Sequence, residues 1–159
     1  MYEQKFMRRV LELSQQGMTN GHGGPFGSVI VKDGAVLGEA HNEVLSSKDP
    51  TAHAELLAVR RASARLQSFD LRGCELYTNG APCCMCMSSM LWARIERVFY
   101  VLSMEESASI GLGDQPFYDE LSRPLDKRQI IPMVQERELA AEARAVYDRW
   151  IAKPDKVQF

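Results

Sequence analysis

The 159-residue sequence lacks several features that would place it in a specialised class of protein. It has no run of about 18 apolar residues, the length of a membrane-spanning helix, so a membrane protein is not expected. Its formal net charge is −2, so there is no overall excess of Lys and Arg to neutralise phosphates, and nucleic acid is not expected as a partner. Four cysteines are too few for a disulfide scaffold. Without repeats or low-complexity tracts, one domain over residues 1–159 is the simplest prediction.

The remaining composition is that of an ordinary globular protein. Hydrophobic residues make up 45% of the chain and charged residues 25%, which is enough apolar content for a full core at this length. Residues 1–13 mix charges into their apolar positions, unlike the apolar segment of a secretory signal. We therefore expect a cytoplasmic protein, whose cysteines serve metal binding or catalysis.

Hydrophobic periodicity predicts alternating helices and strands. Two apolar runs around Asp33 and Gly34 predict a hairpin in residues 28–40. Helices are predicted at 2–13, 53–66, 83–95, 117–121 and 139–150. Further strands are predicted at 74–78, 97–101 and 129–134, with a long loop at 103–116. This order predicts the α/β class, a three-layer α/β/α sandwich with a five-stranded mixed sheet.

Three of the four cysteines are crowded into residues 80–89, which read GAPCCMCMSS. Cys83 and Cys86 are three residues apart, so on a helix they lie on one face, where two thiolates can hold one Zn²⁺. The positive potential of the helix N-terminus favours the thiolate form. Cys84 lies about 100° around the helix and should point elsewhere. The spacing therefore predicts Cys83 and Cys86 as zinc ligands.

A third ligand is predicted some 30 residues earlier, at His53. The pattern H-x-E followed by P-C-x-x-C is the signature of zinc deaminases. Three protein ligands leave the fourth zinc position for a water, whose pKa the metal lowers to about 7. Glu55 is predicted to move that proton as general acid and base. Because residues two apart face opposite ways on an ideal helix, His53 and Glu55 must share a loose first turn.

Two further interpretations of these cysteines remain open. A C-x-x-C pair at a helix start is also the redox motif of thioredoxin-like proteins. A closed structural zinc site would need a fourth ligand, from Cys74, Cys84, His22 or His41. Neither interpretation gives Glu55 a role. Cys74 lies in an apolar strand and is expected to be a small buried hydrophobe.

The sequence resembles the cytidine deaminase superfamily, and within it the small zinc-dependent guanine deaminases. The similarity rests on GGPFGSVIVKDG (23–34), Asn42, DPTAHAE (49–55), LYT (76–78), PCCMC (82–86), WAR (92–94) and VFY (98–100). The resemblance implies hydrolytic deamination of free guanine, a small-molecule nucleobase, to xanthine and ammonia. It also implies that His53, Cys83 and Cys86 bind Zn²⁺ and that Glu55 shuttles protons.

The same resemblance implies a set of substrate contacts. Asn42 would hydrogen-bond the base edge, and the backbone of Ala54 would contact the reacting side. Phe26 and Trp92 would wall the pocket, and Asp114 would be a second acidic group. The C-terminal segment 153–159 would cross over in a homodimer, so that Phe159 caps the partner's site. Alternatively, the two aromatic residues could belong to the core, Asn42 to a turn, and Asp114 to a helix cap.

The sequence departs from its relatives at three places near the expected pocket. Ala81, Cys84 and Phe159 stand where relatives carry glutamate, proline and tyrosine. None of the three is an expected ligand or proton shuttle, so these changes bear on the substrate more than on the reaction. Isocytosine or a related 2-amino-4-oxo heterocycle is therefore an alternative substrate. The motifs are also compatible with a tRNA adenosine deaminase and with a non-enzymatic zinc-stabilised binding domain.

Overall fold

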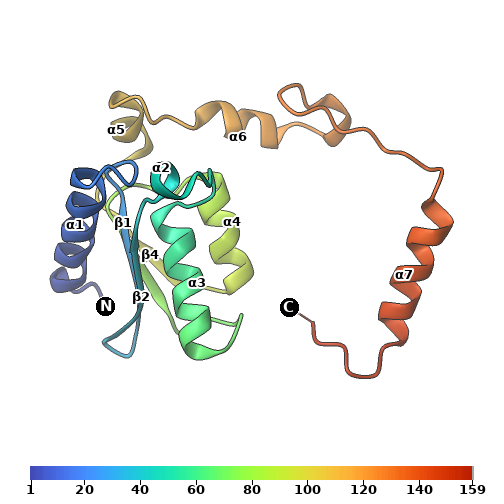
Figure 1. Cartoon of the computed structure of the whole chain (residues 1–159), viewed down its shortest axis with the longest axis horizontal. Coiled ribbons are helices and arrows are strands. Elements are labelled where there is room, and N and C mark those ends of the chain that lie inside the picture. Colours follow the sequence, from blue (N-terminus) through green and yellow to red (C-terminus); the bar gives the residue numbers. More distant parts are fainter. Residues whose placement is uncertain (159) are drawn as a thin grey trace. The chain divides into compact units, whose positions relative to one another are not determined.

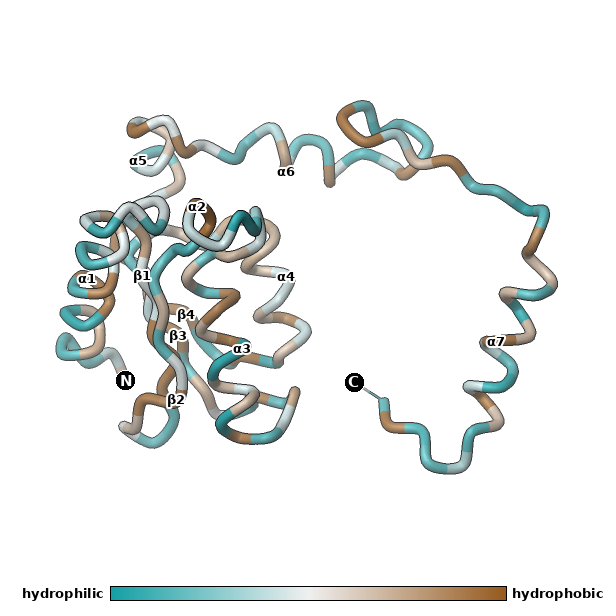
Figure 2. The backbone as a smooth tube through the Cα atoms, viewed as in Figure 1, coloured by the Kyte–Doolittle hydropathy of each residue, from teal (hydrophilic) through white to brown (hydrophobic). Residues whose placement is uncertain are grey.

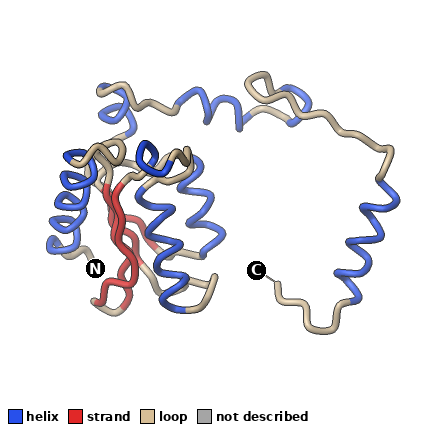
Figure 3. Tube along the Cα trace, viewed as in Figure 1, coloured by secondary structure: helices blue, strands red, loops and turns tan. Residues whose placement is uncertain are grey.

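The computed structural model describes residues 1–158, which divide after Asp114 into two compact units. The first unit, residues 1–114, holds α1 (Gln4–Thr19), β1 (Gly27–Lys32), β2 (Ala35–His41), α2 (Val44–Ser47), α3 (Ala54–Leu66), β3 (Glu75–Thr78), α4 (Cys84–Ala93), β4 (Arg97–Phe99) and α5 (Met104–Ser109). The second unit holds α6 (Gln115–Ser122), the 3-10 turn η1 (Leu125–Lys127) and α7 (Ala140–Ala152). Figures 1 and 3 show these elements along the chain.

The sheet of the first unit is mixed and open, with strand order β2-β1-β3-β4. Strand β1 runs antiparallel to β2 and β3, whereas β3 and β4 are parallel. Helix α1 covers one face of the sheet, and α3 and α4 cover the other (Figure 1). The predicted α/β layers and the mixed sheet are confirmed.

Strand alternation divides the core between the two faces of the sheet. Val29 of β1 and Tyr77 of β3 pack with the buried side of α1. Their neighbours in sequence, Ile30 and Leu76, point to the other face and pack with α3 and α4. Hydrophobic positions accordingly recur along the helices of this unit in Figure 2. The hairpin is confirmed too, because Asp33 and Gly34 have φ of 50° and 76°, as a type I′ turn requires.

The prediction of a fifth strand at 129–134 is wrong, because the part of the chain described here forms a four-stranded sheet. The backbone amides of Gln129 and Ile130 donate instead to the carboxylate of Glu120, at 2.6 and 2.7 Å. Pro132 has no N–H to give to a ladder. The segment is therefore fixed to α6 by a side chain and not by a neighbouring strand.

The predicted loop at 103–116 contains the helix α5. Ser103 caps it, accepting from the amide of Glu106 at 3.2 Å while the Glu106 carboxylate accepts from the amide of Ser103 at 2.7 Å. This is a capping box. Across residues 1–158, no helix is both long and apolar enough to cross a membrane.

Candidate active site

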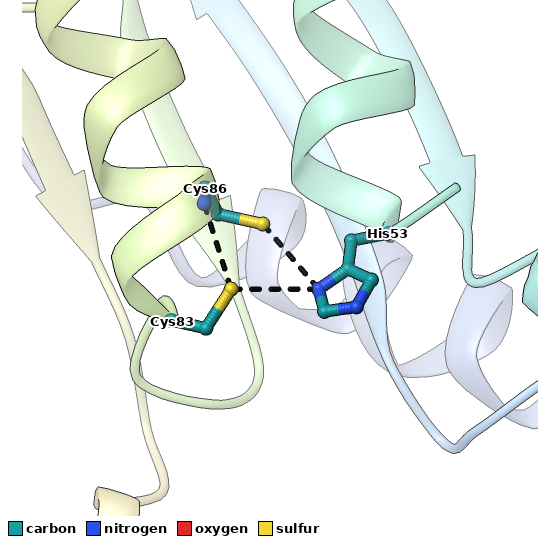
Figure 4. A group of neighbouring side chains, drawn as sticks. All are labelled: His53, Cys83 and Cys86. Atoms are coloured by element: carbon teal, nitrogen blue, oxygen red, sulfur yellow. Dashed lines mark hydrogen bonds between the residues drawn. The ribbon is translucent and has the colours of Figure 1, made fainter. Parts of the chain in front are cut away.

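The candidate site forms where α3 and α4 begin. His53 is the N-cap of α3 and Cys83 is the N-cap of α4, and both have extended backbones, with ψ of 150° and 167°. Each side chain therefore leaves the chain just before its helix starts. Figure 4 shows that the two helix ends face each other, so that His53 points at Cys83 and Cys86.

The three predicted ligands come together at distances that suit a zinc ion. His53 Nδ1 lies 3.6 Å from Cys83 Sγ and 3.5 Å from Cys86 Sγ (Figure 4). Bond lengths of about 2.3 Å to sulfur and about 2.0 Å to nitrogen, at tetrahedral angles, separate two such ligands by about 3.5 Å. The donor set and its spacing therefore fit tetrahedral Zn²⁺. Within the described chain, Cys84 is not part of this group, as its place on the helix predicted.

The start of α4 also favours the thiolate at Cys83. Hydrogen bonds from Cys86, through its side chain and its backbone N–H, and from the ring of His53 lower the pKa of Cys83 to about 4, although burial opposes them. The amide of Cys86 lies 3.5 Å from Cys83 Sγ. A thiolate is the form that binds a metal.

Glu55 lies beside these ligands in the first turn of α3. It is 6% exposed, and burial raises the pKa of its carboxyl group. The pKa of the Cys86 thiol is raised by its hydrogen bond to Cys83, by burial and by the nearby charge of Glu55. Ala54, the residue between His53 and Glu55, is fully buried. His53 does not share the first turn of α3 with Glu55, because it precedes the helix as an extended N-cap, so its side chain is not bound by the helical rule that residues two apart face opposite ways.

Asn42 follows β2 directly and is 6% exposed. Its Oδ1 accepts hydrogen bonds from the amides of Gly24 and Val44, both at 3.2 Å. Its own backbone amide donates to the carbonyl of Phe26 at 2.9 Å. Both side-chain bonds use Oδ1, which leaves Nδ2 as the group of Asn42 that can donate to a ligand.

Of the remaining predicted substrate contacts, Phe26 and Asp114 are half-buried and Trp92 is exposed. Phe26 is half-buried, and its ring packs over Gly80, where a Cβ would stand 3.0 Å from Phe26 Cε1. Asp114 is half-buried, and burial followed by the charge of Cys83 raises the pKa of its carboxyl group, which puts it within electrostatic reach of the ligands. Trp92 lies near the end of α4 and is 68% exposed. Phe159 lies outside the described residues.

Two features around the site were missed from the sequence. Asn79 is 6% exposed and hydrogen-bonds the loop that carries Phe26. His22 and His41 face each other, with Nδ1 of the first 2.8 Å from Nε2 of the second. The only sequence signal for Asn79 was its place between the end of a strand and a glycine, which is typical of an ordinary turn.

Comparison with known proteins decides the family. A family model of the cytidine and deoxycytidylate deaminase zinc-binding region matches residues 1–102, which include His53, Glu55, Cys83 and Cys86. The chain belongs to this family. A zinc cofactor and the expected resemblance are confirmed, and His53, Cys83 and Cys86 form a group that could hold the ion.

Relatives within the family refine the position of this chain. It is 43% identical over 130 residues to a guanine deaminase of Bacillus subtilis (strain 168), covering 82% of this chain and 83% of that protein. A crystal structure of guanine deaminase from Bacillus subtilis matches with a TM-score of 0.93 and 38% identity, over 100% of this chain and 99% of the other. A tRNA-specific adenosine deaminase of Aquifex aeolicus (strain VF5) is 41% identical over 100 residues, 63% of this chain and 66% of that protein.

Proposed function

We propose that this protein is a zinc-dependent aminohydrolase that converts guanine and water to xanthine and ammonia. The observation that carries the proposal is the buried Glu55 beside the trio of His53, Cys83 and Cys86. A redox C-x-x-C pair or a closed structural zinc site has no use for a buried carboxylate there. The similarity to a guanine deaminase over most of the chain supports guanine as the substrate.

The residues of this chain can supply each proton transfer of the reaction. His53, Cys83 and Cys86 would hold the zinc ion, which would supply a nucleophile at neutral pH by lowering the pKa of a bound water to about 7. Glu55 takes one proton from that water as its oxygen bonds to C2 of guanine, and passes the proton to the adjacent ring nitrogen. Glu55 then carries the second proton to the 2-amino group, which leaves as ammonia while the oxygen stays as the carbonyl of xanthine.

The proposed substrate contacts follow from the polarity of each group. Asn42 donates through Nδ2 to a hydrogen-bond acceptor on the base, since Oδ1 is already occupied by Gly24 and Val44. Phe26 stacks on the flat ring, and the buried backbone at Ala54 contacts the reacting side. Asp114 accepts from the N–H groups of the substrate, and its Oδ2, without a hydrogen-bond partner in residues 1–158, is free for this role.

We further propose a cytoplasmic homodimer in which the tail, residues 153–159, reaches the partner's site, with Phe159 as the cap and Trp92 in the wall. Support comes from apolar residues that one chain leaves exposed: Met87, Leu91 and Trp92 on α4 are 43%, 69% and 68% exposed. Helix α7 has no buried residue, although it carries Tyr147 and Trp150. A second copy would cover such surfaces. Zinc-binding thiols also suit a reducing compartment.

An ammonia-release panel tests the function directly. Zinc-loaded protein is assayed with guanine, isocytosine, adenine, cytosine, cytidine and ammeline, and we expect the highest kcat/KM for guanine. A preference for isocytosine would keep the reaction and replace the substrate. Bound zinc without ammonia release from any of these bases would contradict the enzyme assignment and favour a binding domain.

The relative from Aquifex aeolicus makes tRNA the second substrate to test. Activity on tRNA would fall steeply with salt, because binding would release counterions from phosphates. Deamination of a free base should depend little on salt. Measuring both substrates at low and high salt separates the two functions.

A further inference from the structure

We propose that Asn79 is the positioning residue for the substrate-reading loop 23–27, acting on Phe26 and, through it, on Asn42. The inference rests on the proposed function, because it assigns a role within that site. Asn79 is neither one of the predicted substrate contacts nor a predicted zinc ligand. Its side-chain amide instead brackets Phe26 from both sides in sequence.

Asn79 makes two hydrogen bonds of opposite polarity on either side of Phe26, one buried and one partly buried. The amide of Gly27 donates to Asn79 Oδ1 at 2.9 Å, and Asn79 Nδ2 donates to the carbonyl of Pro25 at 2.8 Å. A third, longer contact joins Nδ2 to the hydroxyl of Ser14 at 3.5 Å. A single amide group therefore fixes the backbone immediately before and immediately after Phe26.

The sheet explains why a side chain takes this place. Strands β1 and β3 pair antiparallel with Ser28 opposite Thr78, so the same register puts Gly27 opposite Asn79. At that point β3 has ended, and the carbonyl of Asn79 accepts from Leu102. Beyond the end of β3, the side chain of Asn79 thus makes the hydrogen bond to Gly27 in place of a backbone group. The same side chain also binds the carbonyl of Pro25, two residues earlier.

The position of Phe26 in turn fixes Asn42, the residue proposed to hydrogen-bond the base. The carbonyl of Phe26 accepts from the amide of Asn42 at 2.9 Å, and Oδ1 of Asn42 holds the amide of Gly24 at 3.2 Å. Next to Asn79, Gly80 leaves room for the ring of Phe26, since a Cβ there would stand 3.0 Å from Cε1. Asn79 and Gly80 therefore set the backbone and the ring of Phe26 together.

Two variants and one control test the inference. Asn79→Leu keeps the approximate volume and removes both hydrogen bonds, and Asn79→Thr keeps one hydroxyl in case the Leu variant does not fold. The matched control is Ser28→Ala, which removes the buried hydroxyl bond to the Tyr77 carbonyl, 3.1 Å long, in the same pair of strands. All are assayed as zinc-loaded full-length protein for zinc content, melting temperature, and KM and kcat on guanine.

We expect KM to rise about tenfold or more in both Asn79 variants, because a small misplacement of binding groups weakens substrate contacts. Zinc should remain bound, and kcat should stay within about threefold of the wild type. Ser28→Ala should lower the melting temperature and leave KM unchanged. A lower melting temperature with unchanged KM in the Asn79 variants would reduce Asn79 to a purely structural residue and overturn the proposal.

Hydrogen exchange separates failure of this inference from failure of the proposed function. If the wild type releases no ammonia from guanine, the function fails, and the exchange of loop 23–27 then decides the inference by itself. In Asn79→Leu, amides of the loop should exchange faster while those of Val29 to Val31 keep the wild-type rate. Equal protection of the loop in both proteins would show that Asn79 does not hold it.

Discussion

Glu55 is buried among polar groups, and that burial raises the pKa of its carboxyl group. A raised pKa makes the carboxyl group a better proton acceptor than an exposed glutamate, and a proton shuttle must accept a proton before it can pass it on. Its closeness to Cys86 means that a substitution must keep the shape of the side chain if zinc is to stay bound.

Glu55→Gln is therefore the most informative single substitution. The amide keeps the size of the carboxyl group but cannot take up a proton, so we expect kcat to fall by about 10² to 10⁴ or more. Zinc, measured by metal analysis of the purified variant, should remain at one ion per chain. Near-normal ammonia release from the zinc-loaded variant would mean that another group moves the protons.

Asn42→Asp separates the two roles of the Asn42 side chain. A carboxylate still accepts from the amides of Gly24 and Val44, so the loop and the melting temperature should be preserved. It cannot donate to an acceptor on the base, and we expect KM for guanine to rise about tenfold or more. If KM is unchanged, the base is not read by Nδ2 of Asn42.

The junction between α1 and β2 holds the His22 and His41 pair. Burial lowers the pKa of His41 below its usual 6.5, with further lowering by His22 and Arg61 and an opposing effect from Glu43. The unfolded chain therefore binds a proton at His41 at a higher pH than the folded protein does. The free energy of unfolding should fall as the pH drops below 6.5 towards the folded-state pKa.

His41→Gln tests this pH dependence. Glutamine can still hydrogen-bond His22 but does not titrate, so the variant should lose less stability than the wild type on acidification. Urea unfolding at about pH 7.5 and about pH 5.5 measures the difference, and acid effects on the zinc ligands are common to both proteins. Parallel loss of stability in both proteins would rule out a contribution from His41.

Elements with a strong local signal were predictable, and those set by one distant side chain were not. The hairpin at Asp33 and Gly34 and the closeness of Cys83 to Cys86 follow from spacings that are present in the sequence itself. The segment 129–134 has strand-like residues, yet the carboxylate of Glu120 binds its amides. The capping box at Ser103 was readable, but the short helix behind it lacks an apolar period. The role of Asn79 depends on strand register, which no local pattern contains.

At the scale of the whole molecule, the exposed apolar residues of α4 and α7 need a surface that covers them. Within its own unit, α4 exposes Leu91 and Trp92, and within the other unit α7 has no buried residue. Exposed apolar surface of this kind is typical of a site that another surface covers. Deleting residues 155–159 should raise KM for guanine or abolish turnover, while zinc stays bound. Unchanged kinetics in the truncated protein would show that the tail does not cover the active site.

Mixing two impaired variants distinguishes a swapped tail from a tail that covers the site of its own chain. The truncated chain keeps Glu55 but lacks its tail, and Glu55→Gln keeps its tail but lacks the shuttle. In a swapped dimer the tail of the second chain completes the site of the first, so co-refolded protein should regain activity. If each tail serves its own chain, the mixture should be as impaired as its components.

Gly23 shows how strictly the loop is specified. A Cβ at this position would stand 2.0 Å from Asn42 Oδ1, closer than any two such atoms can approach. The restriction is one of space and not of backbone strain, because Gly23 is absent from the positive-φ residues of the described chain. In a mutational scan scored by survival on guanine as nitrogen source, position 23 should tolerate no replacement, not even alanine. A site can thus be under strict selection at a residue that has no side chain to offer.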